Sequence, residues 1–308
     1  MLHWVVVGIG DIAVKRVIPA IRNEPRSELY GVVTRNPGKG RDYGGHVWTD
    51  LDEALADPQV NAVYIATPVA LHAPQTIAAL AAGKHVLCEK PVALNYAEAR
   101  GMVDAAQAAG RVLGIAYYRR MYPKVHRAKE LLSSGAIGRP VLAEISCHDW
   151  FNAEDGRRGW LVDPQMAGGG PLFDIASHRI DLLNFLFGQP GSVAAQRSSV
   201  VHRRQVEDSA TVLIEYPDGV RGVVDVRWHC RVGRDEFRIT GTDGVMDLTP
   251  LNGARLLCNG RGEDLPPHPN LHYPCVANFA DHVLESKPLL AGGESSIWTD
   301  WVTEQARR

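Results

Sequence analysis

Val5-Val6-Val7-Gly8-Ile9-Gly10-Asp11-Ile12-Ala13 opens the chain with a short apolar strand, a glycine turn and the start of a helix. Gly8 permits the tight turn, Gly10 lets the backbone approach a pyrophosphate, and Ala13 lets the helix pack on the strand. The N-terminus of the helix then offers N–H groups to the anion. This is the dinucleotide-binding fingerprint with alanine as its third small residue. It predicts that a nucleotide cofactor contacts Gly8, Ile9, Gly10, Asp11 and Ile12.

The end of the second predicted strand, Leu29–Val33, indicates which dinucleotide is bound. An NAD site usually carries an acid there for the ribose 2′-hydroxyl, but no acid follows this strand before Arg41. Thr34 and Arg35 follow instead, and Lys39 is also basic. A hydroxyl and a guanidinium suit a 2′-phosphate. The sequence therefore favours NADP(H), with NAD(H) as the alternative; the other reading is a loop of solvated charges.

The first third of the chain alternates short apolar runs with helical patterns, which predicts βαβ units and a parallel sheet. The predicted strands are Trp4–Val7, Leu29–Val33, Ala62–Ala66, His85–Cys88 and Val112–Ala116. The predicted helices are Ile12–Arg22, a short helix through Ala56 that Asp50 and Glu53 open, Thr76–Ala82, and one from Asn95 to near Gly110.

The pattern changes after about Tyr117, where an α+β domain with an open, mostly antiparallel sheet is predicted. Its elements are a helix over Pro123–Ser134, a strand over Val141–His148, an irregular segment over Asp149–Gly170, a helix over Leu172–Phe187, the hairpins Thr211–Tyr216 with Val220–Trp228 and Asp235–Thr240 with Val245–Leu248, and a helical tail from Tyr273. We therefore predict an α/β protein with a dinucleotide-binding Rossmann domain over 1–118 and a substrate-binding and oligomerisation domain over 119–308. Whether the C-terminal helix packs back on the first domain stays open.

Composition excludes several classes of protein. The 308 residues include 33 basic and 35 acidic ones, so no excess of positive charge is available for nucleic acid. The five cysteines form no CxxC pair, which favours a reducing, cytoplasmic setting over a disulfide framework. The N-terminus lacks the basic region and cleavage site of a signal peptide. Pro58–Gly83 carries no charge, but its polar residues and prolines disfavour a membrane span. Histidine and cysteine spacings predict no metal site.

Two segments carry the residue types that chemistry needs. Glu89-Lys90-Pro91 follows the strand His85–Cys88, at the edge where open α/β sheets bind ligands. Asp174 and His178 lie four apart, on one face of a predicted helix that Asp181 extends. A carboxylate can orient an imidazole, which titrates where a general acid or base must. The alternative for such a pair is an ordinary surface contact.

Together these segments resemble the glucose–fructose oxidoreductase and inositol dehydrogenase (Gfo/Idh/MocA) family. The resemblance rests on Gly8–Ala13, Ala66-Thr67-Pro68, Gly83–Pro91, Ser134–Gly138 and Gly168–Asp181. It implies an N-terminal Rossmann domain, a C-terminal open sheet and an active site between them. It also implies that Lys90, Asp174 and His178 are catalytic. The sequence looks most similar to the NADPH-dependent sugar reductases, such as the 1,5-anhydro-D-fructose reductases.

The resemblance implies further site residues. It assigns Thr34, Arg35, Thr67, His72, Glu89 and Lys90 to the cofactor, and Tyr118, Trp160, Asp174 and His178 to the substrate. A plain helix-start histidine is an equal reading of His72. Trp150, Phe151 and Trp160 are read equally as a sugar-binding wall or as loop anchors. Val69, Tyr118 and Leu161 depart from the family pattern, and the last two put the sugar in doubt.

We thus predict hydride transfer between nicotinamide and a carbonyl or hydroxyl carbon of a sugar, anhydrosugar or polyol. His178 exchanges the proton, Asp174 orients it, and Lys90 bonds the reacting oxygen or is itself the acid. One alternative is an NAD-using glycoside hydrolase, although its Gly-Gly-His-Gly-Gly motif is here Gly168-Gly169-Gly170. The other is a non-catalytic sugar or nucleotide sensor. An uncovered apolar sheet face predicts a homodimer or homotetramer, with Val212, Ile214, Val224 and Val226 as its candidates.

Overall fold

The computed structural model describes residues 1–154 and 158–308. Three residues of the irregular segment predicted over Asp149–Gly170 lie outside the described residues. The described chain divides into two compact units. Unit 1 comprises Met1–Tyr118 and His268–Ile297, and unit 2 comprises Arg119–Pro267 and Trp298–Arg308.

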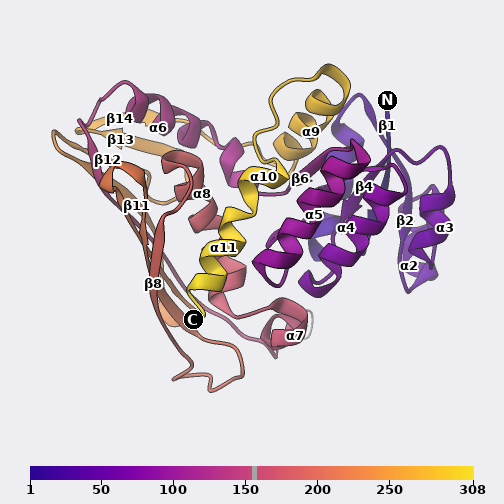
Figure 1. Ribbon diagram of the computed structural model, residues 1–308, viewed down its shortest axis with the longest axis horizontal. Helices are drawn as coiled ribbons and strands as arrows, with labels where there is room; N and C mark the ends of the chain where they lie inside the picture. The colour runs from indigo at the N-terminus through magenta and orange to yellow at the C-terminus, as the bar shows by residue number, and fades with distance from the viewer. Residues whose placement is uncertain (155–157) are drawn as a thin grey trace. The chain divides into compact units, whose positions relative to one another are not determined.

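Six parallel strands form the sheet of unit 1, in the order β3-β2-β1-β4-β5-β6 (Figure 1). They are β1 (Leu2–Val7), β2 (Ser27–Val33), β3 (His46–Trp48), β4 (Ala62–Ile65), β5 (His85–Cys88) and β6 (Leu113–Ile115). This is the strand order of the dinucleotide-binding Rossmann fold, so the predicted α/β class is confirmed. Only β3 was not predicted, because three residues carry too little periodicity.

Helices connect these strands. They are α1 (Ile18–Asn23), α2 (Pro37–Arg41), α3 (Leu51–Ala56), α4 (His72–Ala81) and α5 (Tyr96–Ala109), with α9 (Tyr273–Glu285) and α10 (Gly293–Ser296) from the C-terminal part of the chain. Local chemistry sets their ends. The Asn95 side chain accepts the Glu98 N–H at 2.9 Å to begin α5, and Gly110 ends it with φ +59°.

Residues 268–297, which we assigned to the second domain, cluster with unit 1. The physical reason is burial: Val276, Phe279 and Ala280 of α9 belong to the core that fills one side of the parallel sheet. The rings of Phe279 and Trp4 lie 5.2 Å apart. Helix α9 therefore packs within unit 1, whereas the last helix, α11 (Trp298–Gln305), belongs to unit 2.

Unit 2 is built on an eight-stranded sheet in the order β14-β13-β12-β11-β7-β10-β9-β8. The strands are β7 (Pro140–Trp150), β8 (Ser192–Ser198), β9 (Ser209–Glu215), β10 (Arg221–Arg227), β11 (His229–Gly241), β12 (Val245–Asp247), β13 (Arg255–Cys258) and β14 (Arg261–Asp264). Both predicted hairpins, β9–β10 and β11–β12, are present. Among the described strands of this sheet, β7 and β10 alone pair in parallel, so the sheet is mixed but mostly antiparallel.

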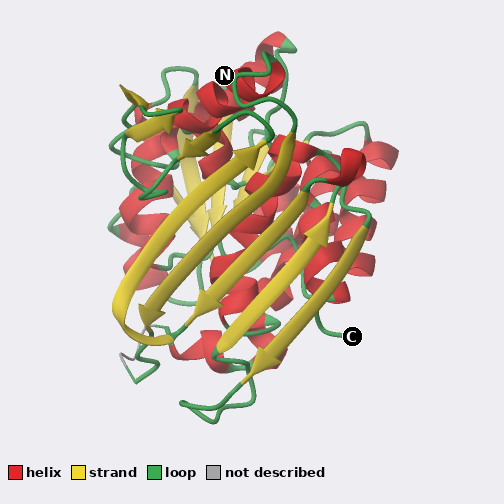
Figure 2. Cartoon of the chain, turned by 90° about the vertical axis from the view of Figure 1, so that its left-hand side faces the viewer, coloured by secondary structure: helices red, strands yellow, loops and turns green. Residues whose placement is uncertain are grey.

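One face of this sheet is covered by the helices of unit 2, among them α8 (Ser177–Phe187) and α11; the unit also holds α6 (Pro123–Ser133) and α7 (Pro164–Ala167). Val212, Ile214, Val224 and Val226 lie on this covered face and are fully buried. They are therefore core residues, and assigning them to a subunit interface was wrong. The opposite face, toward the viewer in Figure 2, carries a polar network in which the Asp225 carboxylate meets His148 at 2.6 Å and Thr211 at 2.6 Å.

Candidate functional site

The glycine turn after β1 leaves no room for a side chain at Gly8. Gly8 has φ +90°, a conformation that side chains other than glycine rarely adopt. A Cβ added there would lie 2.9 Å from the Ala66 carbonyl oxygen. Gly8 N–H also donates to the Val33 carbonyl at 3.0 Å, so the turn is held between β2 and β4.

Gly10 is different, and its surroundings fit a nucleotide. A Cβ added at Gly10 would meet no atom of the described chain within 4 Å. Asp11 and Ile12 are exposed beside it, while Ala13 is fully buried under the helix. The loop thus presents backbone N–H groups to open space at the start of a helix, which is the donor set a pyrophosphate requires. The residues present therefore fit the dinucleotide that the fold implies.

The basic loop after β2 is tied to this turn. Lys39 Nζ donates to the Ile9 carbonyl oxygen at 2.5 Å. Asn36 caps α2 by accepting the Lys39 N–H, and its own N–H donates to the Thr34 hydroxyl at 3.2 Å. Arg35 is exposed. The ammonium of Lys39 and the hydroxyl of Thr34 are therefore anchored at the carboxyl end of the parallel sheet, where the fold binds its ligand.

His72, the first residue of α4, is almost fully buried at 1% exposure. Its Nδ1 lies 2.9 Å from the Pro91 carbonyl and its Nε2 lies 2.9 Å from the Thr67 carbonyl. Burial lowers the pKa of His72 although both carbonyls favour the protonated ring. In this arrangement the imidazole ties the turn after β4 to the turn after β5.

Glu89 follows β5 and is buried. Its Oε1 accepts hydrogen bonds from the Tyr64 hydroxyl at 2.8 Å and His272 Nε2 at 3.0 Å. Burial pushes the pKa of Glu89 up, but the contact with His272 and the bond from Tyr64 outweigh it, so the pKa is lowered. Lys90 is half-buried, and its N–H donates to Glu89 Oε2 at 3.2 Å. The predicted cofactor residue Glu89 thus directs its carboxylate toward protein groups.

In unit 2, the triple glycine Gly168-Gly169-Gly170 is buried at the start of the predicted catalytic helix. Glu207 caps this start: its Oε1 accepts the N–H of Gly170 at 2.8 Å and of Leu172 at 3.0 Å. Burial raises the pKa of Glu207. A Cβ at Gly170 would lie 2.0 Å from the Glu207 carbonyl oxygen. The glycines therefore serve a close backbone contact that the sequence did not predict.

Asp174 lies in a π-helical turn, Leu172–Ala176, and His178 in the α-helix that follows. A second π turn, Ala13–Val17, follows the glycine turn of unit 1. Such turns are frequent at functional sites. Regular α-helix therefore begins only at Ser177, later than the spacing argument for Asp174 and His178 assumes. His178 is 6% exposed.

Asp174 has a partner that the sequence did not predict. Arg158 Nη2 lies 3.0 Å from Asp174 Oδ2. The guanidinium also stacks over the Phe151 ring at 4.9 Å, and Phe151 stacks on Trp228 at 4.2 Å. Arg158 follows a segment with no periodicity, so no signal in the sequence pointed to it.

Asp181, which extends the Asp174–His178 face in the sequence, belongs to a buried ion pair. Arg120 Nε and Nη2 donate to its two oxygens at 2.9 Å and 2.6 Å. Burial raises the pKa of Asp181 to about 6, against the attraction of Arg120. Because both groups are fully enclosed, Asp181 anchors α8.

The aromatic residues before the predicted catalytic helix divide between the two readings, a sugar-binding wall or loop anchors. Phe151 is buried in a cluster with Trp228, as is Leu161, so both anchor the loop. Trp160 is 37% exposed and remains a candidate for substrate contact. Tyr118 packs its ring against His272, with centroids 5.0 Å apart.

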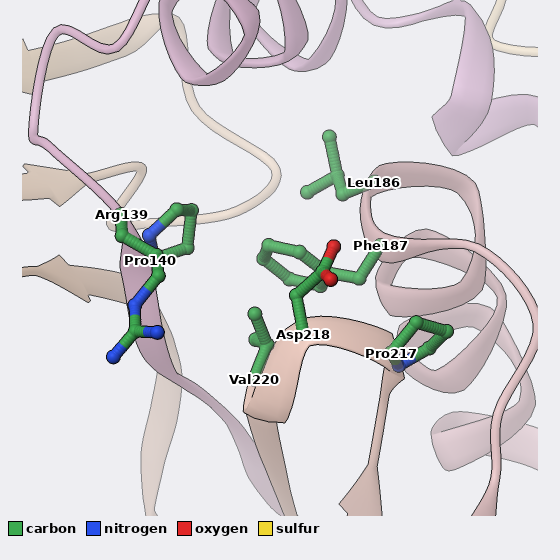
Figure 3. Close-up of a pocket in the computed structure, with 7 residues that line it drawn as sticks. All are labelled: Arg139, Pro140, Leu186, Phe187, Pro217, Asp218 and Val220. Carbon is green, nitrogen blue, oxygen red and sulfur yellow. The ribbon is translucent and has the colours of Figure 1, made fainter.

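The pocket described next does not contain the predicted site residues. A pocket of about 390 Å³ in unit 2 lies between the end of α8 and the turn before β10 (Figure 3). It is lined by Arg139, Pro140, Leu186, Phe187, Pro217, Asp218 and Val220. None of these is a predicted site residue. Within the described ranges, no group of three or more metal-ligating side chains is clustered. Over the same ranges, no helix is long and apolar enough to cross a bilayer.

Two family models match the chain. Residues 2–117 match an oxidoreductase family with an NAD-binding Rossmann fold, and residues 125–247 match the GFO/IDH/MocA C-terminal domain. The 1,5-anhydro-D-fructose reductase of Ensifer adhaerens is 33% identical over 97% of this chain and 93% of its own length.

Solved structures agree with this match. An aldose–aldose oxidoreductase from Caulobacter crescentus, complexed with glycerol, has a TM-score of 0.89 at 26% identity, covering 99% of this chain and 97% of that chain. GenD2 from gentamicin A biosynthesis, in complex with NAD, has a TM-score of 0.85 at 29% identity, covering 100% of this chain and 93% of that chain. The resemblance inferred from the motifs is therefore confirmed.

Proposed function

Since the chain belongs to the Gfo/Idh/MocA family and is an NAD(P)-dependent oxidoreductase acting on CH–OH groups of sugar-type substrates, we propose that it reduces the carbonyl of a sugar or anhydrosugar with NADPH, or runs the reverse oxidation. The observation that carries this proposal is the glycine turn. Its backbone borders open space at Gly10, on the same sheet edge that β5 reaches just before Lys90.

Gly8, Ile9, Gly10, Asp11 and Ile12 hold the nucleotide in this proposal, together with Thr34, Arg35, Thr67, His72, Glu89 and Lys90. The nucleotide, when bound, supplies or accepts the hydride. His72 acts by tying the Thr67 and Pro91 segments together, since both its ring nitrogens face their carbonyls. Glu89 acts through its backbone and through its hydrogen bond with Lys90 N–H.

The chain's own residues handle the proton. His178 gives a proton to the substrate oxygen during reduction and takes it back during oxidation. Asp174 orients His178 and stabilises its protonated form, and Lys90 hydrogen-bonds the reacting oxygen. Lys90 is the rival proton donor, since its ammonium bonds the same oxygen in this proposal. Tyr118 and Trp160 contact the sugar in this proposal, and the exposure of Trp160 supports its part.

Two observations support NADP(H) over NAD(H). No carboxylate follows β2 before Asp42, and Lys39 is fixed beside Ile9 of the glycine turn. A 2′-phosphate attracts such a cation, while a ribose hydroxyl gains little from it. A relative of similar fold binds NAD, so NAD(H) stays the alternative cofactor.

The sugar-type substrate follows the relatives, and a 1,5-anhydro-D-fructose reductase covers nearly the whole chain. A spectrophotometric screen of NADPH and NADH oxidation, and of NADP⁺ and NAD⁺ reduction, against anhydrosugars, aldoses, ketoses and inositols tests cofactor, direction and substrate together. Wild-type turnover that His178→Ala and Lys90→Ala abolish is the expected result. Near wild-type kcat in either variant contradicts the assignment of that residue.

We also propose a homodimer or homotetramer in the cytoplasm. The sheet face around Asp225 is the candidate surface for the assembly, because no helix of unit 2 covers it along its described length. Five free cysteines support the cytoplasmic setting, since a reducing compartment keeps thiols unpaired. Light scattering of the purified protein tests the assembly, and a monomer at micromolar concentration contradicts it.

A further inference from the structure

A buried histidine from the C-terminal part of unit 1 meets the turn that carries Lys90. His272 Nε2 lies 3.0 Å from Glu89 Oε1, across a separation of 183 residues in the sequence. The Tyr64 hydroxyl donates to the same oxygen. His272 is only 3% exposed and Glu89 only 9%. Enclosing such a pair costs free energy unless both partners are well bonded, so its geometry is tightly defined.

The pair is coupled to Lys90 in two ways. Glu89 Oε2, the oxygen that His272 does not contact, accepts the Lys90 N–H at 3.2 Å. The charge of Lys90 also lies near enough to lower the pKa of Glu89, although burial, His272 and Tyr64 weigh more. The carboxylate therefore bridges the imidazole on one side and the backbone of Lys90 on the other.

The imidazole itself is fixed from several directions. His272 N–H donates to the Asn270 side chain at 3.1 Å, and its carbonyl accepts Val276 N–H at 3.1 Å in the first turn of α9. Its ring packs against Tyr118. Its Nδ1 is buried and has no hydrogen-bond partner within the described residues. The ring therefore uses one nitrogen, and that nitrogen points at Glu89.

We propose that His272 is a positioning residue for Lys90, acting through Glu89. The inference rests on the proposed function, in which Lys90 bonds the reacting oxygen. With His272 in place, the Glu89 carboxylate is engaged by an imidazole and a phenol. Without it, the carboxylate has lost a hydrogen-bond partner and turns toward the ammonium of Lys90, the residue whose N–H its other oxygen accepts. That ammonium is then held away from the substrate and is harder to deprotonate.

The first test needs no substrate. Trace labelling with acetic anhydride, followed by peptide mass spectrometry, compares Lys90 with Lys15, whose side chain is 64% exposed. His272→Phe keeps a ring against Tyr118 but loses the N–H, so Lys90 labelling relative to Lys15 should fall by about fivefold, as for one ordinary hydrogen bond. His272→Gln keeps a donor and should restore most of the labelling. His268→Phe, a nearby exposed histidine that stacks on Tyr273, is the control and should match the wild type.

The second test separates this inference from the proposed function. With NADPH and 1,5-anhydro-D-fructose as probe, His272→Phe should lower kcat about tenfold with little change in the KM for NADPH, and His272→Gln should recover most of it. If Lys90→Ala keeps its kcat, the proposed function is wrong, whatever the labelling shows. If Lys90→Ala is inactive while His272→Phe labels and turns over like the wild type, the positioning role of His272 is wrong.

Discussion

Arg158 Nη2 lies 3.0 Å from Asp174 Oδ2, and its guanidinium stacks on Phe151, so a positive charge is held beside the carboxylate that is proposed to orient His178. Leu161, which departs from the family pattern, is buried with Phe151. The cation beside Asp174 is therefore Arg158.

This contact predicts the effect of removing the cation. Arg158→Leu removes the positive charge that partly offsets the Asp174 carboxylate, so the protonated form of His178 is favoured. The apparent pKa in the pH profile of kcat/KM should rise, by less than about one unit because the side chain of Arg158 is 54% exposed. Arg158→Lys should shift it less. Arg231→Leu removes another exposed arginine stacked on an aromatic ring, Trp150, and should leave the profile unchanged. An identical profile in all variants contradicts the prediction.

Substitutions at Gly8 and Gly10, the two glycines of the dinucleotide-binding fingerprint, should have different effects on stability and on nucleotide binding. Gly10→Val adds atoms only to open space, so the melting temperature should stay near wild type while NADPH affinity falls by roughly tenfold or more, since the side chain occupies the anion's place. Gly8→Ala meets the Ala66 carbonyl at φ +90° and should lose stability by about 1–3 kcal/mol. Gly188 has the same φ without a close neighbour, so Gly188→Ala isolates the backbone part. Calorimetry with and without NADPH measures both effects, and equal losses of stability at Gly8 and Gly10 are the contrary result.

Arg35 should set the preference between the two nucleotides. Arg35→Ala is expected to raise the KM for NADPH about tenfold and leave the KM for NADH nearly unchanged, because a charge-assisted bond to the 2′-phosphate is worth about 1.5–3 kcal/mol. Arg41→Ala removes a second exposed arginine at the end of α2 and serves as the control. Equal effects on both nucleotides contradict the assignment, as does a wild type that prefers NADH.

The buried pair of Arg120 and Asp181 should matter for stability. Asp181→Leu leaves the Arg120 guanidinium enclosed without either of its two acceptor oxygens, so unfolding in urea should become easier by roughly 3–5 kcal/mol. Replacing both residues, Arg120→Met with Asp181→Leu, should cost much less than the single change. A double variant as unstable as Asp181→Leu would falsify this account.

The same carboxyl group predicts a pH dependence. The pKa of Asp181 is about 6 in the folded protein against an ordinary value of 3.8. Between pH 3.8 and pH 6 the Asp181 carboxyl has lost its proton in the unfolded chain but keeps it in the folded chain. The contribution of Asp181 to the free energy of unfolding therefore falls as the pH rises toward 6, and it is constant above that pH. The difference in unfolding free energy between the wild type and the double variant, measured from pH 4 to 7, should follow this course, and a flat difference contradicts it.

Those elements that depend on residues close together in the sequence could be predicted from the sequence alone. The glycine turn, the strand His85–Cys88 and the capped helix after Asn95 were predicted closely, because each depends on residues within a few positions. The parallel sheet followed from the alternation of strands and helices, and the motif spacing was sufficient to indicate the family. The strands β3, β8, β13 and β14 were not predicted, because they are held by their neighbours in the sheet rather than by their own pattern.

Tertiary structure alone decided which groups surround the proposed catalytic residues. His272 reaches Glu89 across 183 residues, and Glu207 caps Gly170 across 37. It also decided that Val212 and Val224 face the helices of their own unit, since an alternating strand does not reveal which apolar face is covered from within. The sequence by itself determined the cofactor fold and the identity of Lys90, Asp174 and His178 as candidates. The ion pairs and caps around them depend on contacts between distant segments, which no local pattern encodes.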